Sequence, residues 1–291
     1  MIQSRRQVWQ YAMFQIPLMA VIACLIIAIL SWFLHLGKPP VSTAIVLDLS
    51  NSTSGIIREQ EIQAVKSYLA ENQTLKRPHQ VQVFGFASQV QPLNSGFSTN
   101  TQEIESQITQ YLETVNTSQV LGGVESNVDL AIQEGVKALS QQQKHCRELL
   151  LVTDGLADVS MVAIESAIRE RVKINSVIVG DQDANPMREA SVLTQGLYFM
   201  ENVSNLQNLF ANTLFARFNS NIKWVIFWLG AAFIFLMWML ILPLDRWVFQ
   251  GIMGLDITLG GQLALSHALF WTVLTLSVIW KVWGLPFGNN C

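Results

Sequence analysis

The stretch Thr43-Ala-Ile-Val-Leu-Asp-Leu-Ser-Asn-Ser52 decides how the middle of this 291-residue chain folds. It opens with a short, continuous apolar run, which is typical of a strand buried on both faces of a parallel sheet. Asp48, Ser50 and Ser52 then occupy alternate positions, so their oxygens can lie along one side where the chain leaves the strand. The stretch therefore predicts a buried strand that ends in carboxylate and hydroxyl groups.

Strands and helices alternate downstream of this first strand. Apolar runs predict further strands at 80–86, 149–153, 174–179 and 197–200. Helical patterns predict helices at 56–72, 104–115, 127–139, 162–171, from Pro186 onward, and 206–218. Such alternation predicts an α/β fold with a doubly wound, mainly parallel sheet and helices on both faces. Ligands of such folds bind beyond the carboxyl ends of the strands.

A second strand end carries similar chemistry. The apolar strand predicted at 149–153 ends in Thr153-Asp154-Gly155, and glycine allows the backbone to turn away close to a ligand. If Asp154 lies near Asp48, two carboxylates and two hydroxyls form a site made only of oxygen atoms. Hard divalent cations such as Mg²⁺ prefer oxygen ligands. The two strand ends together therefore predict a cation site.

At residues 41–215 the sequence resembles the von Willebrand factor type A (VWA) domain. The resemblance rests on Asp48-x-Ser50-x-Ser52, on Thr153-Asp154-Gly155 and on the order of the elements. It implies a metal-ion-dependent adhesion site (MIDAS), in which Ser50 and Ser52 bind the ion directly and Asp48 and Asp154 hold it through water. The family also uses a threonine before its third helix, and Ser126 of Gly122-Gly-Val-Glu-Ser126-Asn corresponds to it. The implied cofactor is Mg²⁺, with Mn²⁺ or Ca²⁺ as alternatives.

Both ends of the chain are apolar. Three runs without acidic or basic residues, at about 16–36, 224–244 and 260–280, have the length needed to cross a bilayer. The first run is longer than the apolar part of a signal peptide and lacks a cleavage site, which favours an uncleaved anchor. We expect three transmembrane helices, with an amphipathic connector at the membrane interface between the last two.

These segments predict how the chain is divided. Residues 1–38 hold a cytoplasmic amino terminus and the first span, 39–218 the VWA domain, and 219–291 a linker, the other two spans and a tail. Arg5 and Arg6 precede the first span and Lys38 follows it, so the charge bias favours a cytoplasmic amino terminus. We therefore expect a multi-pass protein of an inner or cytoplasmic-type membrane, with the VWA domain on the non-cytoplasmic side.

Charge and missing motifs exclude other functions. Between Lys38 and Arg217 the chain carries 13 Lys and Arg against 19 Asp and Glu, and such an acidic domain is a poor partner for nucleic acid. The sequence contains no nucleophile elbow, zinc-protease motif or phosphate-binding glycine loop. We therefore expect a binding protein rather than an enzyme.

The resemblance suggests two functions. In the first, a membrane-anchored scaffold recruits a protein partner, whose carboxylate completes the coordination of the cation, and other membrane subunits join it. In the second, the protein is a chaperone-like accessory subunit that works with a MoxR-type ATPase. This arrangement is similar to membrane VWA proteins associated with bacterial aerotolerance operons.

Overall fold

The computed structural model describes residues 8–51, 53, 55–114, 126–154, 158–180 and 184–284. The chain forms two compact units. One comprises Pro39–Asn219, and the other combines Met1–Lys38 with Ser220–Cys291. Each unit is described separately below.

Within the described residues, the Pro39–Asn219 unit contains a six-stranded sheet. Its order is β3-β2-β1-β4-β5-β6, in which only β3 is antiparallel to its neighbour. The strands are β1 (Val41–Asp48), β2 (Gln80–Phe86), β3 (Val90–Pro92), β4 (Cys146–Thr153), β5 (Val172–Val179) and β6 (Tyr198–Glu201). The chain reverses its direction of winding between β1 and β4, so their carboxyl ends form the switch point of the sheet.

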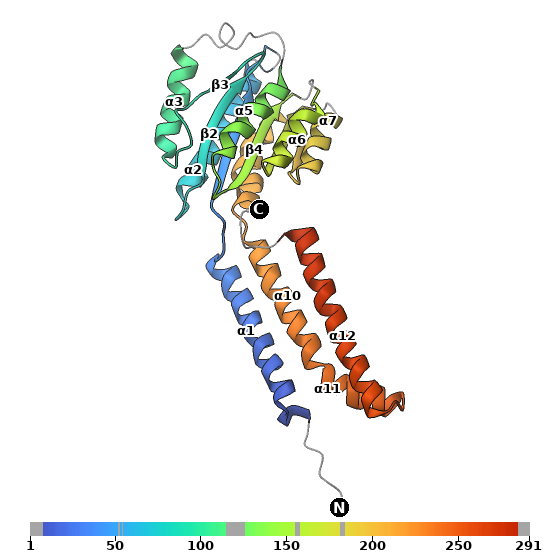
Figure 1. Ribbon diagram of the computed structural model, residues 1–291. Coiled ribbons are helices and arrows are strands. Elements are labelled where there is room, and N and C mark those ends of the chain that lie inside the picture. The colour runs from blue at the N-terminus through green and yellow to red at the C-terminus, as the bar shows by residue number, and fades with distance from the viewer. Residues whose placement is uncertain are drawn as a thin grey trace, which may run out of the picture. The chain divides into compact units, whose positions relative to one another are not determined.

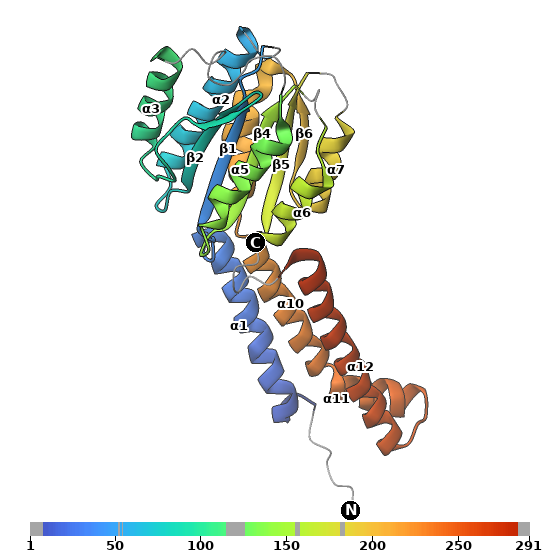
Figure 2. The same ribbon diagram turned by 45° about the horizontal axis from the view of Figure 1, so that its top comes forward.

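Helices cover both faces of this sheet (Figures 1 and 2). Their bounds are α2 (Ile56–Gln73), α3 (Thr101–Thr114), α5 (Val128–Ser140), α6 (Met161–Arg169), α7 (Asn185–Leu193), α8 (Leu206–Asn208), the π-helix η3 (Leu209–Leu214) and α9 (Phe215–Phe218), with a short 3₁₀ turn, η2, at Val203–Asn205. The expected doubly wound, mainly parallel α/β fold is confirmed.

Two apolar cores explain this layering. One face of the sheet packs with α2, α3 and the helical segment 206–218, through residues such as Leu47, Val65, Ile104 and Phe210. The opposite face packs with α5, α6 and α7 through a separate set of buried residues, including Val46 and Ile132. Neighbouring positions of β1 point to opposite faces, which is why both sides of this strand are apolar.

The structure extends the predicted strands and adds one. β4 begins at Cys146 and includes Arg147 and Glu148, polar residues that the apolar pattern did not include in a strand. Glu148 is buried there, where it accepts a 2.9 Å hydrogen bond from Asn175 Nδ2. β3 has three residues, too few to show any periodicity.

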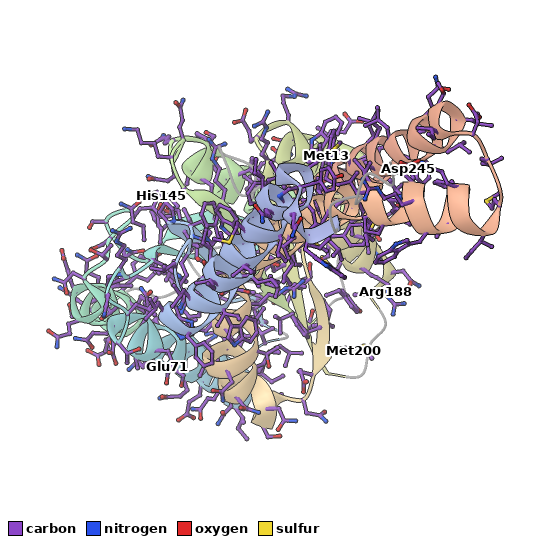
Figure 3. The ribbon with its side chains drawn as sticks, turned by 90° about the horizontal axis from the view of Figure 1, so that it is seen from below. Met13, Glu71, His145, Arg188, Met200 and Asp245 are labelled. Atoms are coloured by element: carbon purple, nitrogen blue, oxygen red, sulfur yellow. The ribbon has the colours of Figure 1, made fainter. Side chains whose placement is uncertain are left out.

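The other unit is helical. It contains η1 (Val8–Gln10), α1 (Ala12–Leu34), α10 (Ile222–Met239), α11 (Ile241–Pro243), η4 (Leu244–Ile252), α12 (Ile257–Val278) and η5 (Ile279–Trp283). Among the described residues, three helical segments are long and apolar enough to cross a membrane: Ala12–Leu34, the apolar part of Val203–Ile252, and Ile257–Val282. Large apolar side chains such as Met13 and Ile16 stay exposed on α1 (Figure 3). The three expected apolar helices are therefore present.

A buried asparagine joins α1 to α10. Asn221 Nδ2 donates hydrogen bonds to the carbonyl oxygens of Ser31, at 2.7 Å, and Leu36, at 3.0 Å. Leu36 follows the last turn of α1, where carbonyl groups have no partner within the helix. Asn221 thus caps α1 from the residue that precedes α10.

We expect replacement of Asn221 with alanine to loosen this cap. The carbonyl of Ser31 keeps the N–H of Leu36, whereas the partly buried carbonyl of Leu36 loses the donor Asn221. Leaving such a group without a donor costs about 1–3 kcal/mol, and 1.4 kcal/mol corresponds to a factor of ten. Hydrogen exchange in the peptide covering 31–38 should therefore accelerate about tenfold in the full-length protein in lipid nanodiscs. Thr258→Ala, at an exposed position of α12, is the control and should leave that peptide unchanged. Equal exchange in both variants would show that the two hydrogen bonds do not hold the end of α1.

Candidate metal centre

Asp48 is the centre of the candidate site. It is the last residue of β1, and its side chain is completely buried. Since Leu47 pairs with Val152 of β4, Asp48 lies beside Thr153 at the switch point of the sheet. Burying a carboxylate costs free energy unless hydrogen bonds or opposite charges replace its contacts with water.

Three residues supply hydrogen bonds to this carboxylate. The backbone N–H of Ser50 donates at 3.0 Å, Thr153 Oγ1 at 2.9 Å, and Ser126 Oγ at 3.1 and 3.0 Å to the two oxygens. Burial raises the pKa of Asp48, and the hydrogen bonds from Ser50, Thr153 and Ser126 act in the opposite direction. A carboxylate surrounded by hydroxyl groups offers only oxygen atoms, which suits a hard divalent cation.

Local structure positions the distant Ser126. Asn127 caps the start of α5, because its side chain accepts a hydrogen bond from the N–H of Leu130. The N–H of Asn127 also donates to the carbonyl of Ala87, directly after β2. The start of α5 is thereby fixed to the same sheet edge, with Ser126 against Asp48.

The loop after β1 is held by α2 and by a threonine. Thr53 Oγ1 donates to the carbonyls of Asp48 and Ser50, at 2.6 and 3.1 Å. Arg58 of α2 donates from Nη2 to the carbonyls of Leu49 and Ser50, at 2.9 and 3.1 Å. These contacts fix the backbone that presents Ser50.

The structure brings together most of the residues predicted for the metal site. Asp48, Ser50 and Ser126 are in hydrogen-bond contact, and the half-buried Asp154 follows Thr153 at the end of β4. Ser52, the fifth predicted ligand, lies outside the described residues. The donor set is entirely oxygen, which fits a divalent cation such as Mg²⁺.

Residues 43–156 match the family model of the von Willebrand factor type A domain. The unit Pro39–Asn219 contains a VWA domain. A search of curated proteins finds no match.

Solved structures share the fold of this VWA domain. A von Willebrand factor type A protein from Catenulispora acidiphila is 12% identical with a TM-score of 0.52, and the match covers 62% of this chain and 43% of that one. The TFIIH p34 N-terminal domain is 13% identical with a TM-score of 0.50, over 61% of this chain and 99% of that one. A conserved hypothetical protein, BatB from Bacteroides thetaiotaomicron, is 16% identical with a TM-score of 0.48, over 61% and 99% of the two chains. The chain thus spans less than half of the first structure.

Residues near the VWA site were missing from the predicted set. Thr153 was quoted only as part of a motif, yet it donates directly to Asp48. Its position as the last residue of an apolar strand is the signal that could have indicated this contact. Glu61 of α2 was also missed, although it is buried and interacts electrostatically with Asp48 and Asp154. A glutamate on an otherwise mixed helix gives no such signal in the sequence.

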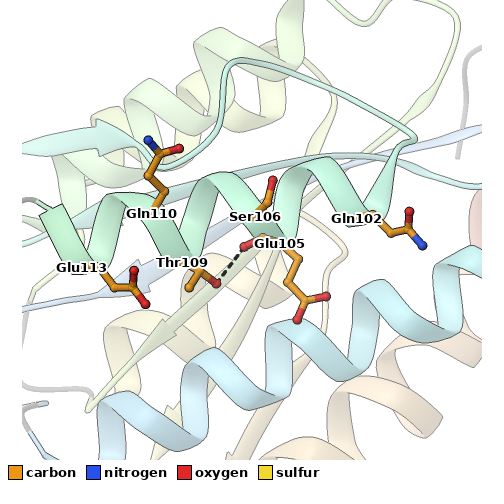
Figure 4. Close-up of a pocket in the computed structure, with 6 residues that line it drawn as sticks. All are labelled: Gln102, Glu105, Ser106, Thr109, Gln110 and Glu113. Carbon is orange, nitrogen blue, oxygen red and sulfur yellow. Dashed lines mark hydrogen bonds between the residues drawn. The ribbon is translucent and has the colours of Figure 1, made fainter.

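Two cavities are lined by described residues of the VWA domain. One of about 260 Å³ adjoins the candidate site and is lined by Ser88, Ser126, Asn127, Val128, Asp129 and Asp158. The other, of about 440 Å³, runs along α3, where Thr109 Oγ1 donates to the carbonyl of Glu105 (Figure 4). Of these two cavities, only the first is lined by a predicted metal ligand, Ser126.

Proposed function

We propose that this protein is a membrane-anchored binding module that recruits a protein partner through a divalent cation. VWA domains generally mediate protein interactions and often bind such a cation. The observation that carries the proposal is the contact of Ser126 and Thr153 with the buried Asp48, across 78 and 105 residues of sequence. This contact gathers oxygen donors from three segments at the switch point.

Ser50, Ser52 and Ser126 would hold the cation directly in this proposal, while Asp48 and Asp154 would hold it through water. The bound cation supplies a positive centre with a remaining coordination position, to which a carboxylate of the partner binds. The protein contributes the buried, hydrogen-bonded carboxylate of Asp48 and the cavity beside Ser126. No acid–base step or covalent step is assigned to these residues.

The helical unit supports the proposal that the protein is anchored in a membrane. Its three segments are apolar enough to cross a bilayer, and their exposed side chains suit lipid contact. The anchor would keep the VWA domain near other subunits of the same membrane, which are the partners we propose. Exposure of the domain on the non-cytoplasmic side, as Arg5 and Arg6 favour, is part of the proposal.

Photo-crosslinking in membranes of the source cell tests this function. A photo-reactive residue at the exposed Asp158, which lines the cavity beside Ser126, should capture a partner when Mg²⁺ is present. Chelation should abolish the crosslink, and renewed Mg²⁺ should restore it. The same photo-reactive residue at the exposed Glu165 of α6 is the control and should give no cation-dependent product.

The identity of the captured protein then separates the possible functions. A membrane subunit that loses the crosslink when its contacting Asp or Glu is neutralised would support the scaffold function. A MoxR-type ATPase would instead support the accessory function and a cytoplasmic VWA domain. A crosslink that persists unchanged with chelator would contradict recruitment through a cation.

A further inference from the structure

Glu61 is an acidic residue in an unusual place. Its side chain has an exposed fraction of 0%, and neither carboxyl oxygen has a hydrogen-bond partner in the described part of the chain. It belongs to the inner face of α2, together with Ala64, Val65 and Tyr68. Fully buried glutamates are rare unless they are paired, so this position requires an explanation.

The surroundings place Glu61 beneath the candidate metal centre. Arg58, one helical turn earlier, is bonded to the carbonyls of Leu49 and Ser50 in the loop that carries the proposed ligands. Ala64 and Val65, one turn later, share an apolar core with Leu47 and Leu49, the two neighbours of Asp48. Glu61 thus lies on the buried face of α2, one helical turn from the arginine that holds this loop and one turn from residues of the apolar core.

The environment of Glu61 favours the neutral form of its carboxyl group. Burial raises the pKa of Glu61 well above its ordinary value, and the negative charges of Asp48 and Asp154 add to this effect, whereas Arg58 opposes it. An unpaired buried charge is strongly unfavourable, so this environment favours the protonated form of the carboxyl group. In the absence of a cation, Glu61 therefore lowers the stability of the folded domain.

A cation at the switch point changes this balance. Asp48, Asp154 and an ionised Glu61 carry three negative charges, and Arg58 carries one positive charge. The remaining charge of minus two is the charge that a divalent cation neutralises. Without Glu61 the same group of charges would be left with a positive excess when the cation binds.

We propose that Glu61 is a positioning residue of the cation site, a third carboxylate that strengthens cation binding by its charge from beneath the ligands. This inference rests on the proposed function, because it requires a cation at Asp48, Ser50, Ser52, Ser126 and Asp154. Glu61 itself is not a ligand. Cation binding is therefore coupled to loss of the Glu61 proton.

Calorimetric titration of the full-length protein in nanodiscs with Mn²⁺ at pH 7.5 tests the proposal. In two buffers with different ionisation enthalpies, wild type should release more protons per cation than Glu61→Gln. The variant should bind Mn²⁺ about tenfold more weakly, in the range found when outer partners of metal sites are removed. Glu61→Asp, which keeps the charge, should retain most of the affinity, and Glu165→Gln on exposed α6 should equal wild type.

A second measurement needs no cation. The raised pKa of Glu61 means that the folded state binds the proton more tightly than the unfolded chain does. The resulting stability is complete below pH 4.5, the ordinary pKa, and is lost as the pH rises toward the folded-state pKa. In chelator at pH 7.5, peptides of β1 and β4 should therefore exchange hydrogen more slowly in Glu61→Gln than in wild type. This difference should shrink near pH 5.

The outcomes separate the two proposals. Equal affinity and equal proton release in wild type and Glu61→Gln would overturn the inference while leaving the cation site intact. Absence of Mn²⁺ binding in wild type would overturn both the cation site and the inference. Weaker binding by Glu61→Gln, exchange in β1 and β4 no faster than in wild type, and a larger proton release by wild type would together support the proposal and exclude misfolding.

Discussion

Replacing Asp48 with asparagine is expected to weaken Mn²⁺ binding about 10- to 100-fold, the usual effect of removing a carboxylate that holds a metal through an outer contact. Asparagine is nearly isosteric with aspartate, so the change removes the negative charge with little change in volume. It also gives Ser126 and Thr153 a weaker acceptor for the hydrogen bonds that now fix them. The loss combines reduced charge with poorer positioning of a proposed ligand.

The signal of free Mn²⁺ in electron paramagnetic resonance measures this affinity directly. Wild-type protein in nanodiscs should remove about one Mn²⁺ per chain from solution, and Mg²⁺ should compete for the same site. Glu165→Gln removes one exposed negative charge from α6 and should bind as wild type does. Equal binding by Asp48→Asn and Glu165→Gln would show that any bound Mn²⁺ lies elsewhere on the acidic surface.

The Asp48 variant also links cation binding to recruitment. If the partner carboxylate completes the coordination of the cation, the Mg²⁺-dependent crosslink from position 158 should disappear in Asp48→Asn. Hydrogen exchange in β1 and β4 should stay protected, because asparagine preserves the packing of the two strands. A lost crosslink with retained protection would therefore trace the defect to the site rather than to unfolding.

Reporters attached before residue 1 and after residue 291 are expected on opposite sides of the membrane. The reason is that three helical segments of the described chain are apolar enough to cross, and three crossings, an odd number, would separate the two ends. Arg5 and Arg6 favour the amino-terminal reporter in the cytoplasm, and this orientation exposes the VWA domain on the other side. A cysteine introduced at the exposed Glu165 should then react with a membrane-impermeant maleimide in intact cells.

Charge reversal provides the matched control for topology. Arg5→Glu combined with Arg6→Glu removes the positive charges that precede α1 and should increase the fraction of inverted protein. Two reporters on one side in the wild-type protein would contradict three crossings. α12 would then be the first helix to question, because it starts with Thr258, Gly260, Gly261 and Gln262.

Much of the fold was predictable from local patterns. Apolar runs identified five of the strands in the described sheet, and alternation with helices gave a mainly parallel, doubly wound arrangement. The exceptions have local causes. The start of β4 contains polar residues, and the buried Glu148 is stabilised there by a hydrogen bond from Asn175. β3 is a short edge strand with no detectable pattern.

The candidate site was predictable only as a set of residues. Spacing and resemblance grouped Asp48, Ser50, Ser52, Ser126 and Asp154, and their function as cation ligands remains a prediction. No local pattern could give the pairing register that sets Asp48 beside Thr153, because register depends on how two strands distant in sequence meet.

Glu61 shows most clearly what the sequence by itself could not determine. The helical spacing of Ile57, Ile62, Val65 and Leu69 predicts that these residues form the apolar side of the helix. The structure buries Glu61 and leaves Ile57 and Ile62 only partly buried. The sequence determined the strands, the helices, the apolar ends and the oxygen-rich strand end, because each depends on neighbouring residues. Which face of α2 turns inward is decided by packing against the sheet and the segment 206–218, and that tertiary contact buries the carboxyl group of Glu61.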